Sequence, residues 1–207
     1  MNSSENVLTG QWSSKQSLPK KLFTCGHCGH KSGSEHGYLL HAKGKSHIKI
    51  AFIYICGGCN QPSYFGDGQQ VPAPILGNRV DGLPEELNNL YSEARQCTSI
   101  GAYTACVLAC RKMLMHIAVD RGATEGENFW AYVQYLNDNN YIPPNGGGWV
   151  DYIREKGNEA NHEIVVMEEM DAFRLLSFVE MLLKFIYEFP SMLPSNNSES
   201  EEIEAGE

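Results

Sequence analysis

Two cysteine pairs near the start of the chain have the spacing of metal ligands. Cys25 and Cys28 form one Cys-x-x-Cys turn, and Cys56 and Cys59 form the second. Each turn directs two thiolates toward one point, and two turns complete the tetrahedral four-sulfur set that zinc prefers. Because four sulfurs leave no coordination position for water, we expect the zinc to be structural. A redox pair would stand alone beside a βαβ pattern and a disulfide would require an exported chain, and the sequence shows neither context.

A second set of residues that could do chemistry lies in the C-terminal half. Arg154, Asn158 and His162 are four residues apart, so on a helix they form one row. In such a row, arginine could bind a phosphate and its developing charge, histidine could move the proton of a ribose 2′-hydroxyl, and asparagine could orient the ribose. A solvated polar face is the alternative interpretation of this row. The apolar residues of the same stretch fall on the opposite side of the helix: Trp149, Val150, Ile153, Gly157, Ala160 and Ile164.

The elements that must position these residues differ between the two halves. Residues 38–41 and 47–55 are rich in β-branched and aromatic side chains and predict a small antiparallel sheet between the cysteine pairs. Prolines and glycines exclude a helix from 61 to 82. Helical periods follow, which predict helices near 84–97, 103–121 and 129–136, one starting near 149, and one at 167–189.

These patterns predict a mainly α fold, a helical bundle preceded by a small β zinc ribbon. We expect a zinc ribbon at 20–62, a linker at 63–82, the helical bundle at 83–190 and a disordered acidic tail at 191–207. The tail is rich in serine, asparagine and glutamate and has too few apolar groups to pack.

The charge of the chain is unevenly divided. The 207 residues carry a net charge of -9, but residues 1–80 hold eight Lys and Arg against three Asp and Glu, which gives +5. A phosphate-rich partner such as RNA is therefore expected to meet the N-terminal half first. No apolar run is long enough to cross a bilayer, and the first ten residues lack a secretion signal. We expect a cytoplasmic protein without membrane contact.

The residues around the polar row resemble a known family. The run from Ile153 to His162 is similar to the Arg-x-x-Gly-Asn-x-x-x-His signature of the bacterial family called domain of unknown function 4145, a branch of the HEPN superfamily. The resemblance extends roughly from Leu83 to Phe189 and includes the run that starts at Arg111. HEPN domains are helical bundles that typically dimerise, so that arginine and histidine of two copies face each other. Many are metal-independent ribonucleases, and an N-terminal zinc ribbon often accompanies them.

The resemblance implies two hypotheses. In the first, the chain is a homodimeric RNA-binding protein or metal-independent endoribonuclease of a phage-defence, toxin–antitoxin or restriction-linked system, with Arg154, Asn158 and His162 at the dimer cleft. In the second, it is a non-catalytic zinc-ribbon adaptor or antitoxin-like partner that binds nucleic acid or another defence protein. The second stays open because seven residues separate Arg154 from His162, more than in the nuclease signature of active HEPN proteins.

Overall fold

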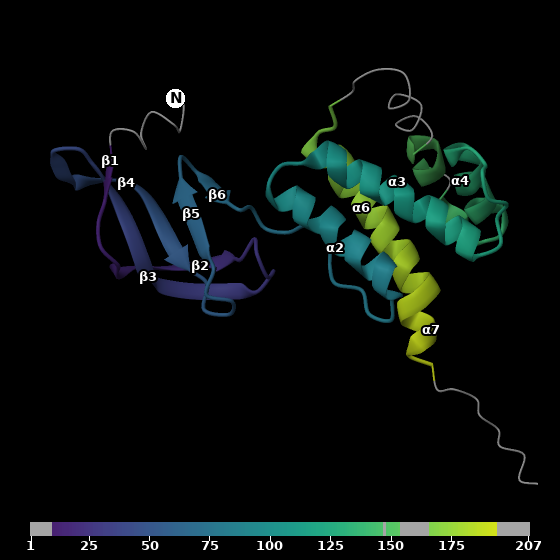
Figure 1. Ribbon diagram of the computed structural model, residues 1–207, viewed down its shortest axis with the longest axis horizontal. Coiled ribbons are helices and arrows are strands. Elements are labelled where there is room, and N and C mark those ends of the chain that lie inside the picture. The colour runs from purple at the N-terminus through teal and green to yellow at the C-terminus, as the bar shows by residue number, and fades with distance from the viewer. Residues whose placement is uncertain (1–9, 147, 154–165, 194–207) are drawn as a thin grey trace, which may run out of the picture.

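The chain consists of two halves joined by a short connecting segment (Figure 1). The computed structural model describes residues 10–146, 148–153 and 166–193. Residues 10–71 form the sheet half and residues 85–193 form the helical half. The connecting segment, residues 72–84, leads from the last strand to the first described helix (Figure 1).

The sheet half is a six-stranded antiparallel sheet. Strands β1 and β2 both pair with β3, and the order continues through β4 and β5 to β6. The strands are β1 (Gly10–Trp12), β2 (Gln16–Thr24), β3 (Lys31–Ala42), β4 (Lys45–Ile55), β5 (Pro62–Gly66) and β6 (Gln69–Val71). The expectation of a mainly α chain is therefore wrong, because the sheet extends well beyond the two short runs that the sequence indicated.

The sheet is larger than expected because its edge strands carry weak sequence signals. Strand β6 and all but the first residue of β5 lie in the proline- and glycine-rich stretch 63–82, where the sequence predicts a linker with at most one short strand. They are joined by Asp67 and Gly68, whose φ angles are 52° and 77°. Two central residues with positive φ are typical of the type I′ turn that closes a tight hairpin. The turn pairs Gly66 with Gln69 and so allows a hairpin where the composition suggested irregular chain.

Strand β2 bends across one face of the sheet and closes the smaller core. Its register with β3 shifts between Ser17 and Lys21, and the carbonyl oxygen of Pro19 accepts a hydrogen bond of 2.9 Å from the Tyr54 hydroxyl. The Phe23 ring then meets the Phe65 ring on β5 at 5.2 Å between centroids. We call the covered face the inner face of the sheet and the opposite one the outer face.

The helical half confirms most of the expected helices. Its elements are α2 (Glu85–Ser99), α3 (Tyr103–Asp120), α4 (Phe129–Asp138), the short 3-10 turn η1 (Pro144–Gly146), α6 (Glu169–Leu183), the π-helical turn η2 (Lys184–Glu188) and α7 (Phe189–Ser191). Residues 148–153 are also helical. Within the described parts of the chain, no helix is both long enough and apolar enough to cross a membrane.

Helix α3 lies at the centre of the larger core. It packs against α2, α4 and α6, and its apolar stripe is fully buried. Cys106, Cys110 and Met113 belong to this stripe, so both cysteines pack as small apolar residues. The spacing of three and four residues that predicted the helix also put these side chains on one face.

The connecting segment is bound to the helical half by hydrogen bonds. Leu76 N–H donates to the Thr98 hydroxyl at 3.1 Å, and Arg95 donates to the carbonyl oxygens of Leu76 and Gly77 at 3.2 and 2.9 Å. Val80 is 2% exposed and belongs to the helical core. The later part of the expected linker is therefore a packed part of the structure.

Glu180 on α6 is the buried acceptor that fixes this segment. Its carboxylate accepts hydrogen bonds from Asn78 N–H at 2.8 Å, from Asn78 Nδ2 at 2.9 Å and from Lys184 Nζ at 2.6 Å. Burial opposes its ionisation, but the hydrogen bonds from Lys184 and Asn78 lower the pKa of Glu180 below its usual value. The carboxylate is thus the form that the fold stabilises.

We expect Glu180→Gln to destabilise the chain by about 2 kcal/mol at neutral pH, because a charged acceptor with three donors is lost. Since the folded pKa of Glu180 is lowered, its contribution is complete above the unfolded value of about 4.3 and is lost as the pH falls through the folded value. Urea unfolding followed by circular dichroism from pH 7 to pH 3 should show the difference from wild type shrinking on acidification. Glu93→Gln, at an exposed site on α2, is the control. A constant difference at all pH values would contradict this role.

Candidate metal centre and the cavity beside the predicted catalytic row

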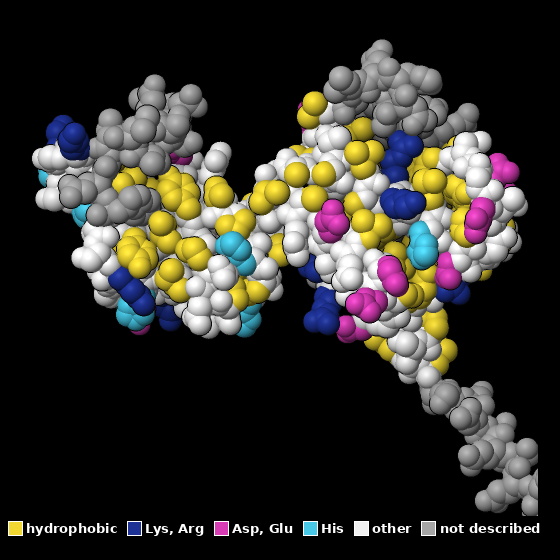
Figure 2. All heavy atoms as spheres, viewed as in Figure 1, with side chains coloured by type: hydrophobic (Ala, Val, Ile, Leu, Met, Phe, Trp, Pro, Cys, Tyr) yellow, Lys and Arg dark blue, Asp and Glu magenta, His cyan; other side chains and the backbone are white. Residues whose placement is uncertain are grey.

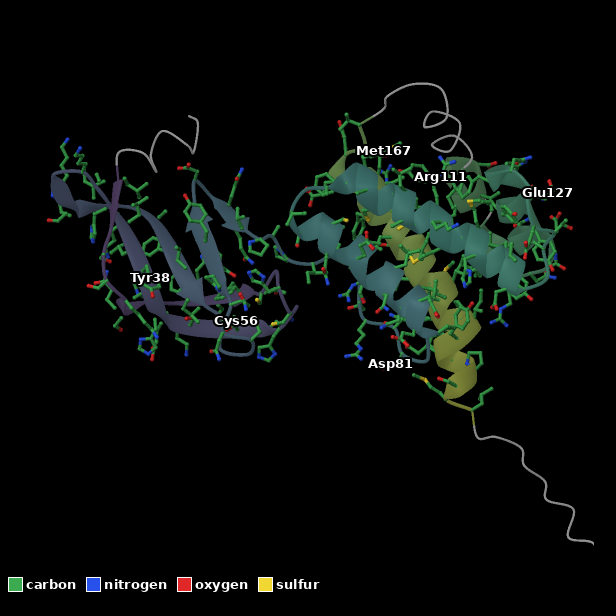
Figure 3. All side chains as sticks on the ribbon, viewed as in Figure 1. Tyr38, Cys56, Asp81, Arg111, Glu127 and Met167 are labelled. Carbon is green, nitrogen blue, oxygen red and sulfur yellow. The ribbon has the colours of Figure 1, made fainter. Side chains whose placement is uncertain are left out.

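The four predicted metal ligands lie together in the sheet half. Cys25 and Cys28 lie in the turn between β2 and β3, and Cys56 and Cys59 lie in the turn between β4 and β5. Their sulfur atoms are all within 4.8 Å of one another. Cys25 and Cys56 are fully buried, while Cys28 is exposed. Figure 3 shows Cys56 at the end of β4. The sequence prediction that two turns converge on one point is confirmed.

The two cysteine turns have the same backbone geometry. In the first, Cys25 N–H donates to His30 O at 2.9 Å and Gly29 N–H donates to Cys25 O at 2.9 Å. In the second, Cys56 makes the same two bonds with Gln61 and Asn60, both at 3.0 Å. The residue after the last cysteine of each turn has positive φ, 71° at Gly29 and 58° at Asn60. Such matched turns each present two sulfurs from a rigid loop.

The sulfur distances fit one tetrahedral metal ion. Cys25 Sγ lies 3.7 Å from Cys59 Sγ, and Cys28 Sγ lies 3.9 Å from Cys56 Sγ. Zinc bound at about 2.3 Å to four sulfurs would place neighbouring sulfurs about 3.8 Å apart. A disulfide would require about 2.05 Å, and all four cysteines are free. The donor set and its spacing therefore match a metal centre and exclude cross-links between the turns.

Backbone N–H groups point to two of the four sulfurs, and the pKa shifts of the cysteines differ. Burial raises the pKa of Cys25, whereas the pKa of Cys56 is lowered. His27 N–H points to Cys25 Sγ and Gly58 N–H to Cys56 Sγ, each at 3.4 Å. Burial opposes ionisation of Cys56, but the backbone N–H groups of Cys59 and Gly58 and the hydroxyl of Ser32 lower the pKa of this thiol to about 6. Thiolate is the form that a metal ion requires.

The nearby histidines have other contacts. His27 Nε2 lies 3.0 Å from the Pro62 carbonyl oxygen, and the His30 ring packs beside Gly58. Among the described residues, the metal-capable group contains only the four cysteines. The first cysteine turn, which contains Gly26, also touches the connecting segment. A side chain on Gly26 would collide with the carbonyl oxygens of Pro72 and Ala73.

The predicted catalytic row lies outside the described residues. Arg154, Asn158 and His162 fall within 154–165, so the structure describes only the residues before and after them. Before the row, residues 148–153 are helical, Ile153 is buried, and the Trp149 ring stacks on Phe178 with centroids 5.6 Å apart.

A hydrogen bond joins the two flanks of the row. The Tyr152 hydroxyl donates to Asp171 Oδ1 at 2.8 Å, and Asp171 Oδ2 accepts from the Glu168 N–H at 3.2 Å in a capping box that starts α6. Met167 N–H donates to the Thr104 hydroxyl at 3.0 Å. The chain just before and just after the row is therefore held at one place.

Arg111 on α3 lines the same small cavity as Tyr152 and Asp171. A cavity of about 10 Å³, large enough for one water molecule, is lined by Val107, Arg111, Phe129, Tyr152, Ile153, Met167, Asp171 and Leu175. Figure 3 shows Arg111 and Met167 on the same side of the helical half. The Arg111 guanidinium lies 4.3 Å above the Phe129 ring centre, and burial lowers the pKa of Arg111. Arg174 lies over the Tyr152 ring at 5.5 Å.

The sequence alone did not place these groups. From the sequence, Arg111 could be a neighbour of the row or a solvated side chain, and no pattern indicates Tyr152, Asp171 or Arg174. Glu168 and Asp171 have the three-residue spacing of a capping box, a helix-start pattern that could have identified Asp171 from the sequence. These four side chains come together through contacts between α3, α6 and residues 148–153. Local sequence patterns do not predict such contacts.

Comparison with known proteins identifies the helical half. The profile of a family described as Domain of unknown function (DUF4145) matches residues 92–202, more than half of the 207 residues. The match begins within α2 and leaves out the sheet half. No curated protein and no solved structure matches the chain. The chain belongs to the family Domain of unknown function (DUF4145).

Proposed function

We propose that this chain acts on RNA as a metal-independent endoribonuclease related to the HEPN superfamily, with Arg154, Asn158 and His162 as its catalytic residues. The observation that supports the proposal is the hydrogen bond between Tyr152 and Asp171, beside Arg111. It holds both flanks of the row next to a half-buried guanidinium. A fixed cation at this position would attract a phosphate to the residues that follow Ile153.

The reaction would proceed by internal transesterification. His162 would take the proton of a ribose 2′-hydroxyl, and the 2′-oxygen would attack the adjacent phosphorus. The bond from phosphorus to the 5′-oxygen of the next nucleotide would break, and that oxygen would leave with a proton from water. Arg154 would stabilise the negative charge on the phosphoryl oxygens, and Asn158 would orient the ribose. The products would be a 2′,3′-cyclic phosphate and a 5′-hydroxyl end.

We propose that the four-cysteine centre holds a structural zinc ion. The spacing of the sulfurs and their buried position support this metal. Cys25, Cys28, Cys56 and Cys59 would complete its coordination and leave no position for water. The ion would therefore hold the two turns together and take no part in RNA cleavage.

The assay that tests the nuclease function uses labelled RNA and the full chain. Cleavage should occur in EDTA at a concentration that leaves zinc bound, and mass spectrometry should detect cyclic phosphate ends. If no RNA is cut under any condition, the alternative function applies, a zinc-ribbon adaptor or antitoxin-like partner in a phage-defence, toxin–antitoxin or restriction-linked system. The basic sheet half favours this second candidate.

In both cases we place the protein in the cytoplasm, where the free thiols of Cys97, Cys106 and Cys110 stay reduced.

We propose that two copies pair through the exposed face of α6, η2 and α7. Large apolar side chains follow this face: Met170, Phe173, Phe185, Phe189 and Met192 are each more than 40% exposed. A groove of about 570 Å³ runs beside them and includes Ser177 and Met181. The small side chain of Ser177, between Phe173 and Met181, would let a second helix approach. Two identical faces related by a two-fold axis would then bury each other.

Replacing Phe173 and Phe185 together by serine is expected to convert the dimer to a monomer. Each substitution removes an aromatic ring from the centre of the proposed interface. Light scattering after size-exclusion chromatography measures the mass. Leu108→Ser is the matched control, because Leu108 is 55% exposed on α3, away from this face. A wild-type chain that is monomeric at about 50 µM protein would refute the interface, because standard-size interfaces bind with micromolar to picomolar dissociation constants.

A further inference from the structure

The outer face of the sheet carries a row of apolar and aromatic residues. Tyr38 on β3 pairs with Ile53 on β4, Ile53 pairs with Tyr64 on β5, and Tyr64 pairs with Val71 on β6. Residues that pair directly across a sheet point to the same face. We call these four residues the outer row. It contains no charged side chain and crosses four strands.

The outer row lies on the face opposite the core. The inner face holds Leu39, Tyr54 and Phe65, which are covered by Phe23 of β2. In the outer row, Val71 is 51% exposed, and Tyr38, Ile53 and Tyr64 are half-buried. The next row toward the β3–β4 turn contains the fully buried Leu40 and Ala51. Toward the cysteine turns, the same face of β4 continues from the outer row to Ile55, which is half-buried.

Glycine at 66 lets one of these rings lie along the sheet. A side chain on Gly66 would collide with the Tyr64 hydroxyl and ring, so the ring extends over the strand at that glycine. Tyr64 is half-buried, so part of this ring contributes to the surface of the outer face. Tyr38 and Tyr64 lie two strands apart, about 10 Å. This separation suits bases that are splayed along a single strand.

A basic hollow continues from the outer row. Ile55 follows Ile53 on the same face of β4, and it lines a hollow of about 370 Å³ with Lys15, Lys20 and His36. The other lining residues are Gly33, Ser34, Glu35, Cys56, Gly57 and Asn60. Glu35 is the one acid among them. Apolar side chains gather on the visible surface of the sheet half, with Lys and His side chains around them (Figure 2).

We propose that this outer face binds single-stranded RNA, with bases stacked on Tyr38 and Tyr64 and phosphates held by Lys15 and Lys20 in the hollow. Base stacking on aromatic side chains of a sheet, beside a positive groove, is how many proteins bind single strands. The charge of +5 over residues 1–80 favours a polyanionic ligand such as RNA over a protein partner without strong charge. The choice of RNA rests on the proposed function, and the surface itself does not depend on cleavage.

The test measures fluorescence anisotropy of a labelled six-nucleotide single-stranded RNA with the full chain carrying His162→Ala, so that the RNA stays intact. Tyr38→Ala and Tyr64→Ala should each weaken binding about tenfold, the loss typical of one stacked base. Tyr38→Phe should keep the affinity within about twofold, because the ring remains. Lys15→Gln with Lys20→Gln should reduce the slope of log Kd against log salt by about 1.4, since each lost phosphate contact contributes about 0.7.

Matched controls lie in the same half. Leu22→Ala removes a side chain that is 78% exposed on β2, and Lys43→Gln removes a lysine in the turn between β3 and β4. Both should leave RNA binding unchanged, and metal content with circular dichroism should show that every variant is folded. Unchanged binding in the two tyrosine variants, equal affinity for duplex RNA, or no RNA binding would each overturn the proposal.

The outcome is separable from that of the proposed nuclease. If RNA binds through the tyrosines but is never cut, the outer face remains an RNA-binding surface and the nuclease function fails. If RNA is cut with the same KM by wild-type chain and by the chain carrying both tyrosine substitutions, the nuclease function remains and this surface fails.

Discussion

Replacing His162 by alanine is expected to lower the rate of RNA cleavage about 100- to 10,000-fold, the usual contribution of a general acid or base. Arg154→Ala should lose about 100- to 1,000-fold, because the transition-state charge would lose its main cation. The single-turnover rate on saturating RNA measures both effects. RNA binding should change much less, since the bases are held on the sheet half.

The control for this prediction is His47→Ala, which removes an exposed histidine from the sheet half. It should cleave RNA at the wild-type rate. Zinc content and circular dichroism of all variants should match the wild type. Cleavage that persists in both His162→Ala and Arg154→Ala would show that the row is not catalytic and that the helix face is merely solvated.

Cys56→Ser is expected to abolish metal binding and to unfold the sheet half. The wild-type chain should contain one zinc ion per chain, and the variant less than about one tenth of that, because three thiolates cannot replace the full set. Zinc contributes roughly 10–16 kcal/mol to folded zinc-finger peptides, and the core of the sheet half is built from few residues. Plasma mass spectrometry measures the metal, and limited proteolysis should cut within residues 10–71 while the helical half resists.

Cys97→Ser is the matched control for the metal prediction. Cys97 is a free, partly exposed cysteine on α2, so its substitution should leave the metal content unchanged. Cys25→Ser should behave like Cys56→Ser, because both sulfurs are fully buried in the same centre. A Cys56→Ser chain with one zinc ion and a protected sheet half would refute the four-sulfur site.

Several features could be predicted from the sequence because they depend on local spacing. A Cys-x-x-Cys turn fixes where its two sulfurs point, so the meeting of the four cysteines at one candidate metal site could be predicted from spacing alone. Helices α2, α3 and α4 were predicted because apolar residues recur every three to four positions, which holds wherever the helix packs. The family was recognised from a short run around Gly157 and Asn158, and the match to residues 92–202 confirms it.

The extent of the sheet could not be predicted in the same way. Strand β3 alternates small, polar and apolar residues, and β5 begins with a proline, so neither gives a strong strand signal. Their pairing becomes favourable only when Phe23, Tyr54 and Phe65 meet in one core. The outer row likewise exists only through the register of four strands, which places Tyr38 and Tyr64 on one face.

The sequence by itself determined the convergence of the four cysteines, the helices and the family, since each is encoded within a few neighbouring residues. Tertiary structure decided how the connecting segment is held and what surrounds the predicted catalytic row. Asn78 meets Glu180 across 102 residues, and Tyr152 meets Asp171 across the row itself. Such pairs form because burial leaves each polar group only the partners that the fold brings near, and that choice depends on the whole chain.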